Sequence, residues 1–235
     1  MKKILNILLI YFGPCLLIVM LFYSRDNIKN QTFKVSGVNI KTDQNQFVSR
    51  SLIDTLLYDY IVDDDGEALT LSQISFEKIE RVLLSHPSVS SANIYSDING
   101  NVTIDVTPRT PIARVYNGGD VYYIDLSGEK MELSSDYTSR SLIVKGDLNS
   151  LSQLDIFRVC DHIYNDNFLR RQITCIDVLD SELSMFARTG ELIEFGTVSG
   201  ISDKFRKLKL YYGNVDGSFS ILDVRYNNQI ICKNS

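Results

Sequence analysis

Few side chains in this sequence could act as nucleophiles, general bases or metal ligands. The 235 residues include two histidines, four cysteines and no tryptophan. The run from Gly196 to Gly200 reads Gly-Thr-Val-Ser-Gly, whereas the nucleophile elbow of hydrolases requires Gly-x-Ser-x-Gly with a distant histidine and acid. His86 precedes a proline at the end of an expected helix, and His162 is expected on a helix surface. We interpret both as structural and predict no enzyme and no catalytic residue.

Metal and disulfide chemistry have equally little support. Residues 63–67 read Asp-Asp-Asp-Gly-Glu, which places glycine fourth, whereas an EF-hand calcium loop has glycine sixth and glutamate twelfth. We interpret this run as a solvated loop and predict no metal and no cofactor. Cys160, Cys175 and Cys232 form no Cys-x-x-Cys pair. Their spacing is compatible with one disulfide and a free thiol, or with three buried thiols.

The charge balance argues against nucleic acid as a partner. Lysine and arginine total 24 and aspartate and glutamate 29, a net charge of −5. Nucleic-acid-binding domains normally carry a basic patch. Hydrophobic residues make up 44% of the chain, which is enough for a packed core rather than disorder.

An uncharged apolar segment covers residues 4–23. A helix of 20 residues is about 30 Å long, the thickness of the hydrocarbon layer of a membrane. A cleaved signal peptide is the alternative, but its apolar core is usually shorter and ends at small residues. We therefore expect an uncleaved transmembrane helix, with residues 1–3 in the cytoplasm because Lys2 and Lys3 precede the span. A linker over residues 24–32 would follow.

Residues 33–110 have the pattern strand, helix, helix, strand, strand. Apolar residues recur at helical spacing over 48–61 and 76–83, with Ser75 as the expected N-cap of the second helix. His86-Pro87 ends that helix, because the residue before a proline avoids the helical region. Asn99-Gly100 favours a tight hairpin turn between two alternating strands. The pattern predicts a compact α+β unit.

Residues 111–235 are predicted to form a β-rich domain with two helices, so the fold class is α+β. Helices are expected over 152–164 and 202–212, the latter with Phe205 and Leu208 facing the core. Strands are expected over residues 112–115, 121–124, 142–144, 173–179, 183–188, 192–195, 219–226 and 229–232.

This order of segments resembles the FtsQ/DivIB family of bacterial cell-division proteins, in which one membrane span precedes a POTRA domain and a β domain. The resemblance covers nearly the whole chain, although the expected cytoplasmic segment is short and no tryptophan occurs near the C-terminus. The motifs that carry it are His86 to Ile94, residues 101–106, Arg-Thr-Pro-Ile-Ala at 109–113, Tyr-Tyr-Ile-Asp at 122–125 with Gly128, residues 204–210, and Asp-Val-Arg-Tyr at 223–226.

The resemblance implies a non-enzymatic scaffold of the division machinery. Its location would be the inner membrane at the division septum, with the N-terminus cytoplasmic and the bulk of the chain periplasmic. The implied partners are FtsB-like and FtsL-like bitopic division proteins, other divisome components, and membrane lipid through the anchor. In the family, a strand of the FtsB-like protein adds to the sheet edge formed by the last strands, where backbone N–H and C=O groups are unpaired.

Five residues are predicted to form that partner site: Leu222, Asp223, Val224, Arg225 and Tyr226. Arg225 would hold a partner carboxylate through its planar guanidinium, and Tyr226 would offer an apolar face and a hydroxyl. Leu222 and Val224 would support the strand from the core side. Alternatively, Asp223 and Arg225 pair with neighbours on an exposed strand face.

A different class of function is also compatible with the first unit. A POTRA-type envelope-assembly or chaperone module would use the hairpin over residues 92–108 to guide extended substrates. A transmembrane β-barrel or several POTRA repeats would favour that class. In a division scaffold the same hairpin would be a second contact surface, or would simply complete a three-stranded sheet over two helices.

Overall fold

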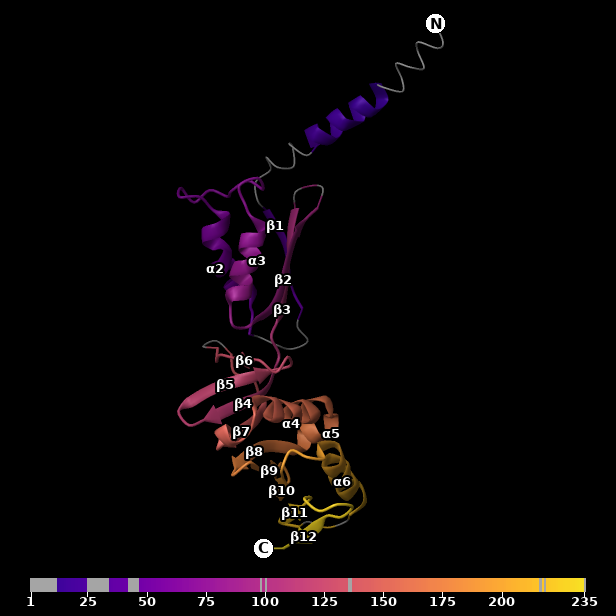
Figure 1. Cartoon of the computed structure of the whole chain (residues 1–235). Helices are drawn as coiled ribbons and strands as arrows, with labels where there is room; N and C mark the ends of the chain where they lie inside the picture. Colours follow the sequence, from indigo (N-terminus) through magenta and orange to yellow (C-terminus); the bar gives the residue numbers. More distant parts are fainter. Residues whose placement is uncertain are drawn as a thin grey trace, which may run out of the picture. The chain divides into compact units, whose positions relative to one another are not determined.

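The computed structural model describes residues 12–24, 34–41, 47–97, 99, 101–134, 137–215, 217 and 219–234. Contacts divide the chain into two compact units, Met1–Pro108 and Arg109–Ser235. Figure 1 shows the order of their elements.

Residues 12–24 form a helix with every side chain exposed. The expected cytoplasmic residues 1–3, most of the expected linker over 24–32, and the first part of the expected span over 4–23 lie outside the described residues. Within the described ranges, no helix has both the length and the apolar character needed to cross a membrane.

The first unit has a three-stranded sheet and two helices, in the predicted order strand, helix, helix, strand, strand. Strand β3 lies at the centre, parallel to β1 and antiparallel to β2. The elements are β1 (Lys34–Ile40), α2 (Arg50–Ile61), α3 (Phe76–Ser85), β2 (Val89–Ser96) and β3 (Asn101–Pro108).

Local capping sets the ends of the two helices. The Ser49 and Ser75 hydroxyls accept hydrogen bonds from backbone N–H groups at the first turns of α2 and α3. Helix α3 ends at Ser85, before His86-Pro87, as predicted. The predicted turn at Asn99-Gly100 falls partly outside the described residues, since Gly100 is not among them. The buried core consists of Val48, Ile53, Leu57, Ile79, Leu83, Val89, Ala92, Val102, Ile104 and Val106.

The second unit is built on a nine-stranded mixed sheet in the order β12-β11-β10-β9-β8-β7-β4-β5-β6. Its strands are β4 (Pro111–Asn117), β5 (Asp120–Asp125), β6 (Lys130–Met131), β7 (Leu142–Gly146), β8 (Ile173–Leu179), β9 (Glu182–Ala187), β10 (Leu192–Gly196), β11 (Ile221–Asp223) and β12 (Ile231–Lys233). Its helices are α4 (Gln153–Asn165), α5 (Asn167–Gln172) and α6 (Ile201–Asn214), with a 3₁₀ turn, η1 (Leu148–Ser150).

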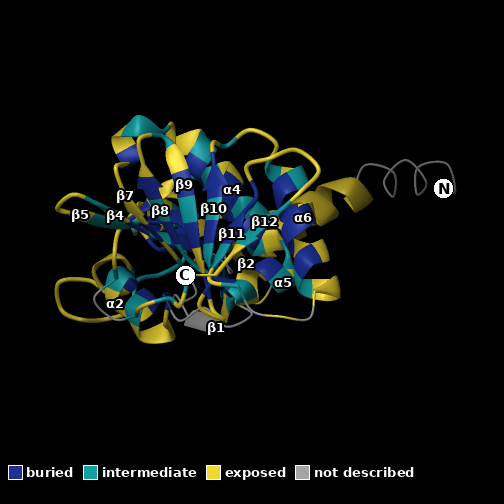
Figure 2. Cartoon of the chain, turned by 90° about the horizontal axis from the view of Figure 1, so that it is seen from below, coloured by how far each residue is buried: buried dark blue, intermediate teal, exposed yellow. Residues whose placement is uncertain are grey.

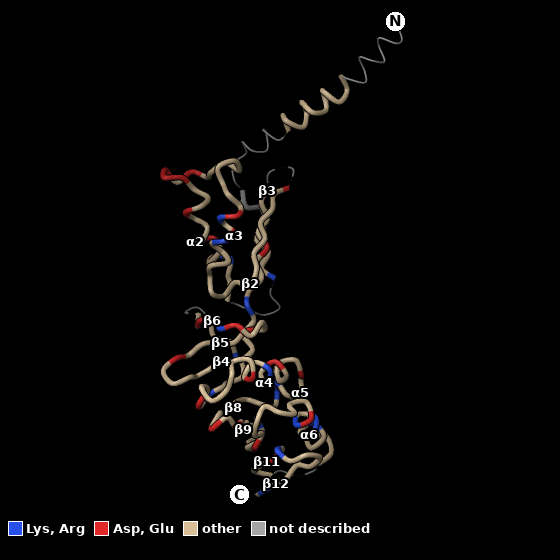
Figure 3. Tube along the Cα trace, in the orientation of Figure 1, with Lys and Arg blue, Asp and Glu red and all other residues tan. Residues whose placement is uncertain are grey.

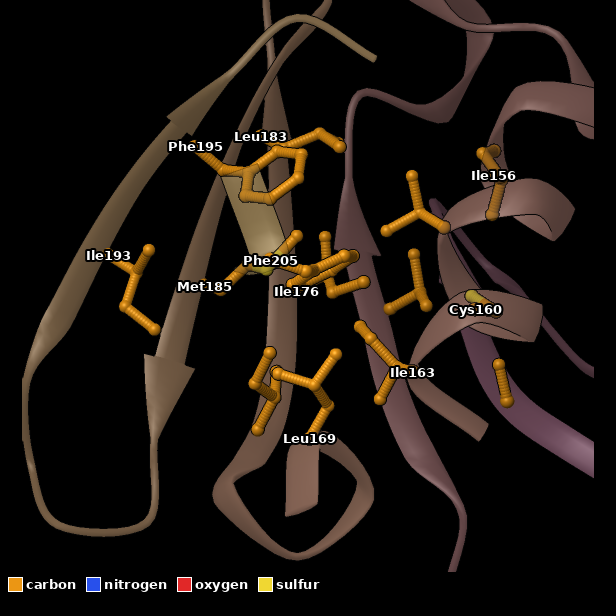
Figure 4. Packing of buried hydrophobic residues seen from close by; sticks show 14 of the residues in the cluster. Ile156, Cys160, Ile163, Leu169, Ile176, Leu183, Met185, Ile193, Phe195 and Phe205 are labelled. Atoms are coloured by element: carbon orange, nitrogen blue, oxygen red, sulfur yellow. The ribbon is translucent and has the colours of Figure 1, made fainter. Parts of the chain in front are cut away.

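A row of paired apolar residues crosses this sheet and packs against the helices. Successive strands contribute directly opposed partners: Val115, Val144, Ile176, Met185, Ile193 and Leu222. Figure 4 shows Ile163 of α4, Leu169 of α5 and Phe205 of α6 among the side chains of this core. In Figure 2 buried residues run along the strands and on α6, whereas the connecting loops are mostly exposed. Phe205 and Leu208 are both fully buried, as predicted.

Two expectations for the second unit are wrong. The described part of this unit has three α-helices rather than two, because Asp166 ends α4 and at once caps α5 by accepting hydrogen bonds from the N–H groups of Phe168 and Leu169. The strand expected over 219–226 is only β11, Ile221–Asp223. The short strand β6 was not expected at all.

The Tyr-Tyr-Ile-Asp motif with its following glycine organises the turn after β5. The Asp125 carboxylate accepts hydrogen bonds from the N–H groups of Ser127 and Glu129 and a 2.6 Å bond from Arg109 Nε. Burial alone would raise the pKa of Asp125, but these hydrogen bonds outweigh it and hold the pKa below its ordinary value. Gly128 has φ +83°, and a Cβ there would lie 3.1 Å from the Phe157 ring.

We predict that Gly128→Ala destabilises the second unit by about 2–3 kcal/mol, since a positive φ and a ring contact both oppose a side chain. Gly118→Ala is the matched control, because Gly118 also has positive φ but has open space around it. Its expected cost is about 1 kcal/mol. Urea denaturation of both variants measures the difference, and equal costs would contradict a role for Phe157.

Candidate partner-binding edge of the second unit

The sheet of the second unit ends at β12. Strand β11 pairs with β10 in parallel on one side and with β12 antiparallel on the other. Among the described residues, β12 pairs with β11 alone. The backbone of Leu222 and Asp223 is therefore already enclosed between two strands, and the edge open to a further strand is Ile231–Lys233.

The five residues predicted for the partner site lie in three different environments. Leu222 and Val224 are fully buried in the core, as expected. Asp223 is only 1% exposed, so it is not on an exposed strand face. Arg225 and Tyr226 follow β11 in the segment that leads to β12, and Tyr226 is 46% exposed. Of the five, Tyr226 is the residue best placed to contact another chain.

Arg225 is engaged by carboxylates of its own chain. Its Nε and Nη2 donate to the two oxygens of Asp223, at 2.9 and 2.7 Å, in a two-point fork. Nη2 also donates to Glu194 Oε2 at 2.9 Å, and Nη1 lies 3.8 Å from Glu182 Oε2. The geometry therefore agrees with the alternative in which Asp223 and Arg225 pair with neighbours, except that the pair is partly buried.

The fork changes the acid–base behaviour of Asp223. Hydrogen bonds from the Arg225 side chain lower the pKa of Asp223 from 3.8 to about 2, even though burial acts in the opposite direction. The carboxylate is therefore charged at neutral pH. It keeps its hydrogen bonds to Arg225 in the loop after β11.

Two buried lysines of α6 bind backbone carbonyls near this site, Lys207 in the loop after β11 and Lys204 in the turn after β10. Lys207, only 7% exposed, donates from Nζ to the carbonyl oxygen of Val224 at 2.9 Å and to that of Tyr226. Lys204 is also buried, and its Nζ donates to the Thr197 carbonyl at 2.7 Å. Sequence reasoning missed both lysines. The sequence did contain a signal for these two lysines. Their helical spacing relative to Phe205, Leu208 and Tyr211 puts them on the inward side of α6.

Gly196, the last residue of β10, leaves room for the side chain of Arg225. Its φ is +71°, and a Cβ at this position would lie 2.8 Å from Cγ of Arg225. The Gly-Thr-Val-Ser-Gly run is thus a turn that lets the Arg225 side chain pass close to the backbone.

The other candidate chemistry found in the sequence has structural explanations. His86 Nδ1 accepts the N–H of Ser88 at the end of α3. His162 is half-buried, not on a surface, and stacks on Phe205 with ring centroids 5.0 Å apart. Asp63 Oδ1 accepts the N–H groups of Asp65 and Glu67 within the acidic loop.

The described cysteines are all free. Cys160 is buried, which raises the pKa of its thiol to about 12 and leaves it protonated and unreactive at neutral pH. Cys175 and Cys232 are half-buried.

Comparison with known proteins agrees with this division into units. A model of POTRA-like domains matches residues 35–107. A second model, described as FtsQ/DivIB, C-terminal related, matches residues 110–233, more than half of the chain. A search of curated proteins gives no match.

The chain therefore has the domain class of a POTRA-like unit followed by an FtsQ/DivIB-type C-terminal domain. It belongs to the FtsQ/DivIB family and is a cell-division protein, as the resemblance implied. Family membership implies interaction with other division proteins.

We predict that Asp223→Asn destabilises the second unit by about 2 kcal/mol at pH 7, because it removes one charge of a buried fork. A lowered folded-state pKa gives stability that is present above the ordinary pKa of 3.8 and is lost as pH falls from there toward 2. The difference between wild type and variant in urea denaturation should therefore shrink between pH 5 and pH 2. Asp120→Asn, at an exposed position, is the control. A difference independent of pH would contradict the assignment.

Proposed function

We propose that this protein is a non-enzymatic scaffold of the division machinery that captures a strand of a partner along the open edge of β12. The observation that carries the proposal is that β12, in the domain matched by the FtsQ/DivIB model, pairs on one side only within the part of the chain that the structure describes. An incoming strand would satisfy the outward N–H and C=O groups of Ile231–Lys233.

A three-residue edge is too short to select a partner by backbone pairing alone, so side chains must supply specificity. Tyr226 precedes the edge strand and combines an exposed ring with a hydroxyl, which is typical of interface anchors. Lys233, with 46% of its side chain exposed and its Nζ 3.5 Å from Glu194, places a charge at the end of the edge. A charged edge residue disfavours indiscriminate strand pairing.

The proposed partners are FtsB-like and FtsL-like bitopic proteins, reached from a membrane anchor over residues 4–23. The uncharged character of that segment and its leading lysines support a cytoplasmic N-terminus in the inner membrane and a periplasmic location for both units. The location along the membrane would be the division septum. Contacts of the POTRA-like unit would link early and late division proteins. Among the described residues, strand β2 lies at one edge of the three-stranded sheet of this unit and could offer such a contact.

We predict that a fluorescent fusion of the full chain forms rings at midcell during constriction, and that depletion of the protein produces filamentous cells. Deleting residues 4–23 should abolish the rings, because the units would lose their anchor. A uniform peripheral signal with normal cell length would contradict a division role and favour envelope assembly.

We predict that Tyr226→Ala weakens binding of the FtsB-like partner at least tenfold, since it removes a half-exposed aromatic anchor without touching the core. Affinity is measured by co-purification and interferometry with the full chain in detergent. Tyr116→Ala, which truncates another exposed tyrosine of the same unit, is the control and should leave affinity within about twofold. Unchanged affinity in Tyr226→Ala would remove this residue from the site.

A further inference from the structure

The face of the second unit's sheet that points away from the helices carries a row of apolar side chains. Each lies one residue before or after a member of the buried row described above, so it points to the opposite side of the sheet. Figure 3 shows the strands of this sheet mostly in tan, the colour of uncharged residues. Five neighbouring strands contribute directly opposed partners, which form the outer row: Ile143, Cys175, Phe186, Leu192 and Ile221.

The outer row is only partly covered by the described part of the chain. Its members do not belong to the core that packs against α4, α5 and α6. Ile143 and Phe186 are each 39% exposed, and the other three members are half-buried. Four gaps of about 4.8 Å between strands make the row about 19 Å long. A continuous apolar row of this length is typical of an interaction surface, whereas single exposed apolar residues are not.

A guanidinium lies at one end of the outer row. Arg114 of β4 is directly opposite Ile143 and is half-buried. Its Cζ lies 5.5 Å from the centroid of the Tyr116 ring and 5.7 Å from that of the Tyr123 ring, and both rings attract the cation. The buried Nε has no hydrogen-bond partner among the described residues. None of the ion pairs in the described ranges includes Arg114.

The paired backbone of the sheet restricts what can cover the outer row. Strands β7 to β11 each have a neighbour on both sides, so their N–H and C=O groups are used within the sheet. A segment lying across them has to satisfy its own backbone groups, which a helix does and a single strand does not. Such a helix presents apolar side chains at every third or fourth residue. At a rise of 1.5 Å per residue, about 13 helical residues span the row.

The charges at the two ends of the outer row favour a different protein over a second copy of this chain. Lys233 of β12 is directly opposite Ile221, so a cation lies beyond each end. Two copies related by a two-fold axis would lie with their rows antiparallel, which places Arg114 near the Lys233 of the other copy. Like charges would then face each other. Lys233 already has Glu194 3.5 Å away, so an acidic residue gains more at the Arg114 end.

We propose that the outer row docks an amphipathic helix of another protein, oriented so that an aspartate or glutamate of that helix binds Arg114. A guanidinium suits a carboxylate because two of its N–H groups can donate to the two oxygens. The two tyrosine rings restrict the motion of the guanidinium, which lowers the entropy lost on binding. The inference does not rest on the capture of a strand by β12, since the row lies on a sheet face and ends at β11.

The first experiment is photo-crosslinking of the full chain in cells. A photoreactive amino acid replaces Ile143, Phe186 or Ile221 in turn. We expect all three positions to capture one segment of one other protein, with the residue captured at 186 about seven residues from each of the other two. An acidic residue should lie at the end captured by position 143. Leu154 is the control position, because it is 55% exposed on α4 and should not capture this segment.

The second experiment measures the affinity of a synthetic peptide of the captured segment for the full chain in detergent, by fluorescence anisotropy. Arg114→Met and Phe186→Thr should each weaken binding at least tenfold. Replacing the acid of the peptide by its amide should weaken binding to the wild type equally and have little further effect on Arg114→Met. Arg158→Met, which removes an exposed arginine of α4, is the control and should change the affinity less than twofold.

Three crosslinking results would overturn the inference: no captured protein, capture only within this chain or of a second copy, and captured residues with the alternating spacing of a strand. Unchanged affinity both in Arg114→Met and with the amide peptide would overturn the role of Arg114. If urea denaturation shows that Arg114→Met does not fold, the amide peptide decides the question. Tyr226→Ala should leave the affinity of this peptide within twofold, so a failure of the proposed function at β12 is distinguishable from a failure here.

Discussion

The fork between Arg225 and Asp223 is the interaction on which the C-terminal margin of the sheet depends. Asp223 is almost completely buried, so its charge is tolerable only while the guanidinium neutralises it. The same guanidinium reaches Glu194 of β10, and Lys207 fixes the carbonyl of Val224. These contacts attach the loop to β10 and α6. They thereby hold a three-residue strand, β12, whose own pairing would be too short to keep it in place.

Because Asp223 and Arg225 pair with each other and with neighbours in the same chain, the residues of the Asp-Val-Arg-Tyr motif have different roles. Asp223 and Arg225 shape the margin, and Tyr226 faces outward from the loop so formed. In the proposed function, recognition would then depend on a loop held in place by internal contacts and carrying one exposed aromatic anchor, which lowers the entropy lost on binding.

The first unit was largely predictable because its signals are local. Ser75 and His86-Pro87 mark the two ends of α3 within a dozen residues, and the apolar spacing between them has a helical period. In the second unit, α5 has only six residues, too few to establish a period. The segment after β11 is held by a contact distant in sequence, because Arg225 donates a hydrogen bond to Glu194, 31 residues away. Lys204 and Lys207 were missed because lysines on a helix usually face solvent.

The parallel pairing of β10 with β11 has a consequence for the timing of assembly. Parallel neighbours need a crossover, and here α6 is that crossover, so β11 and β12 follow it in chain order. In a nascent chain that ends before Ile221, neither β11 nor β12 is present to pair beyond β10, and Arg225 has not yet been synthesised. If β12 is the docking edge, as proposed, a polypeptide that stops before Ile231 would lack that edge and could not bind the partner strand.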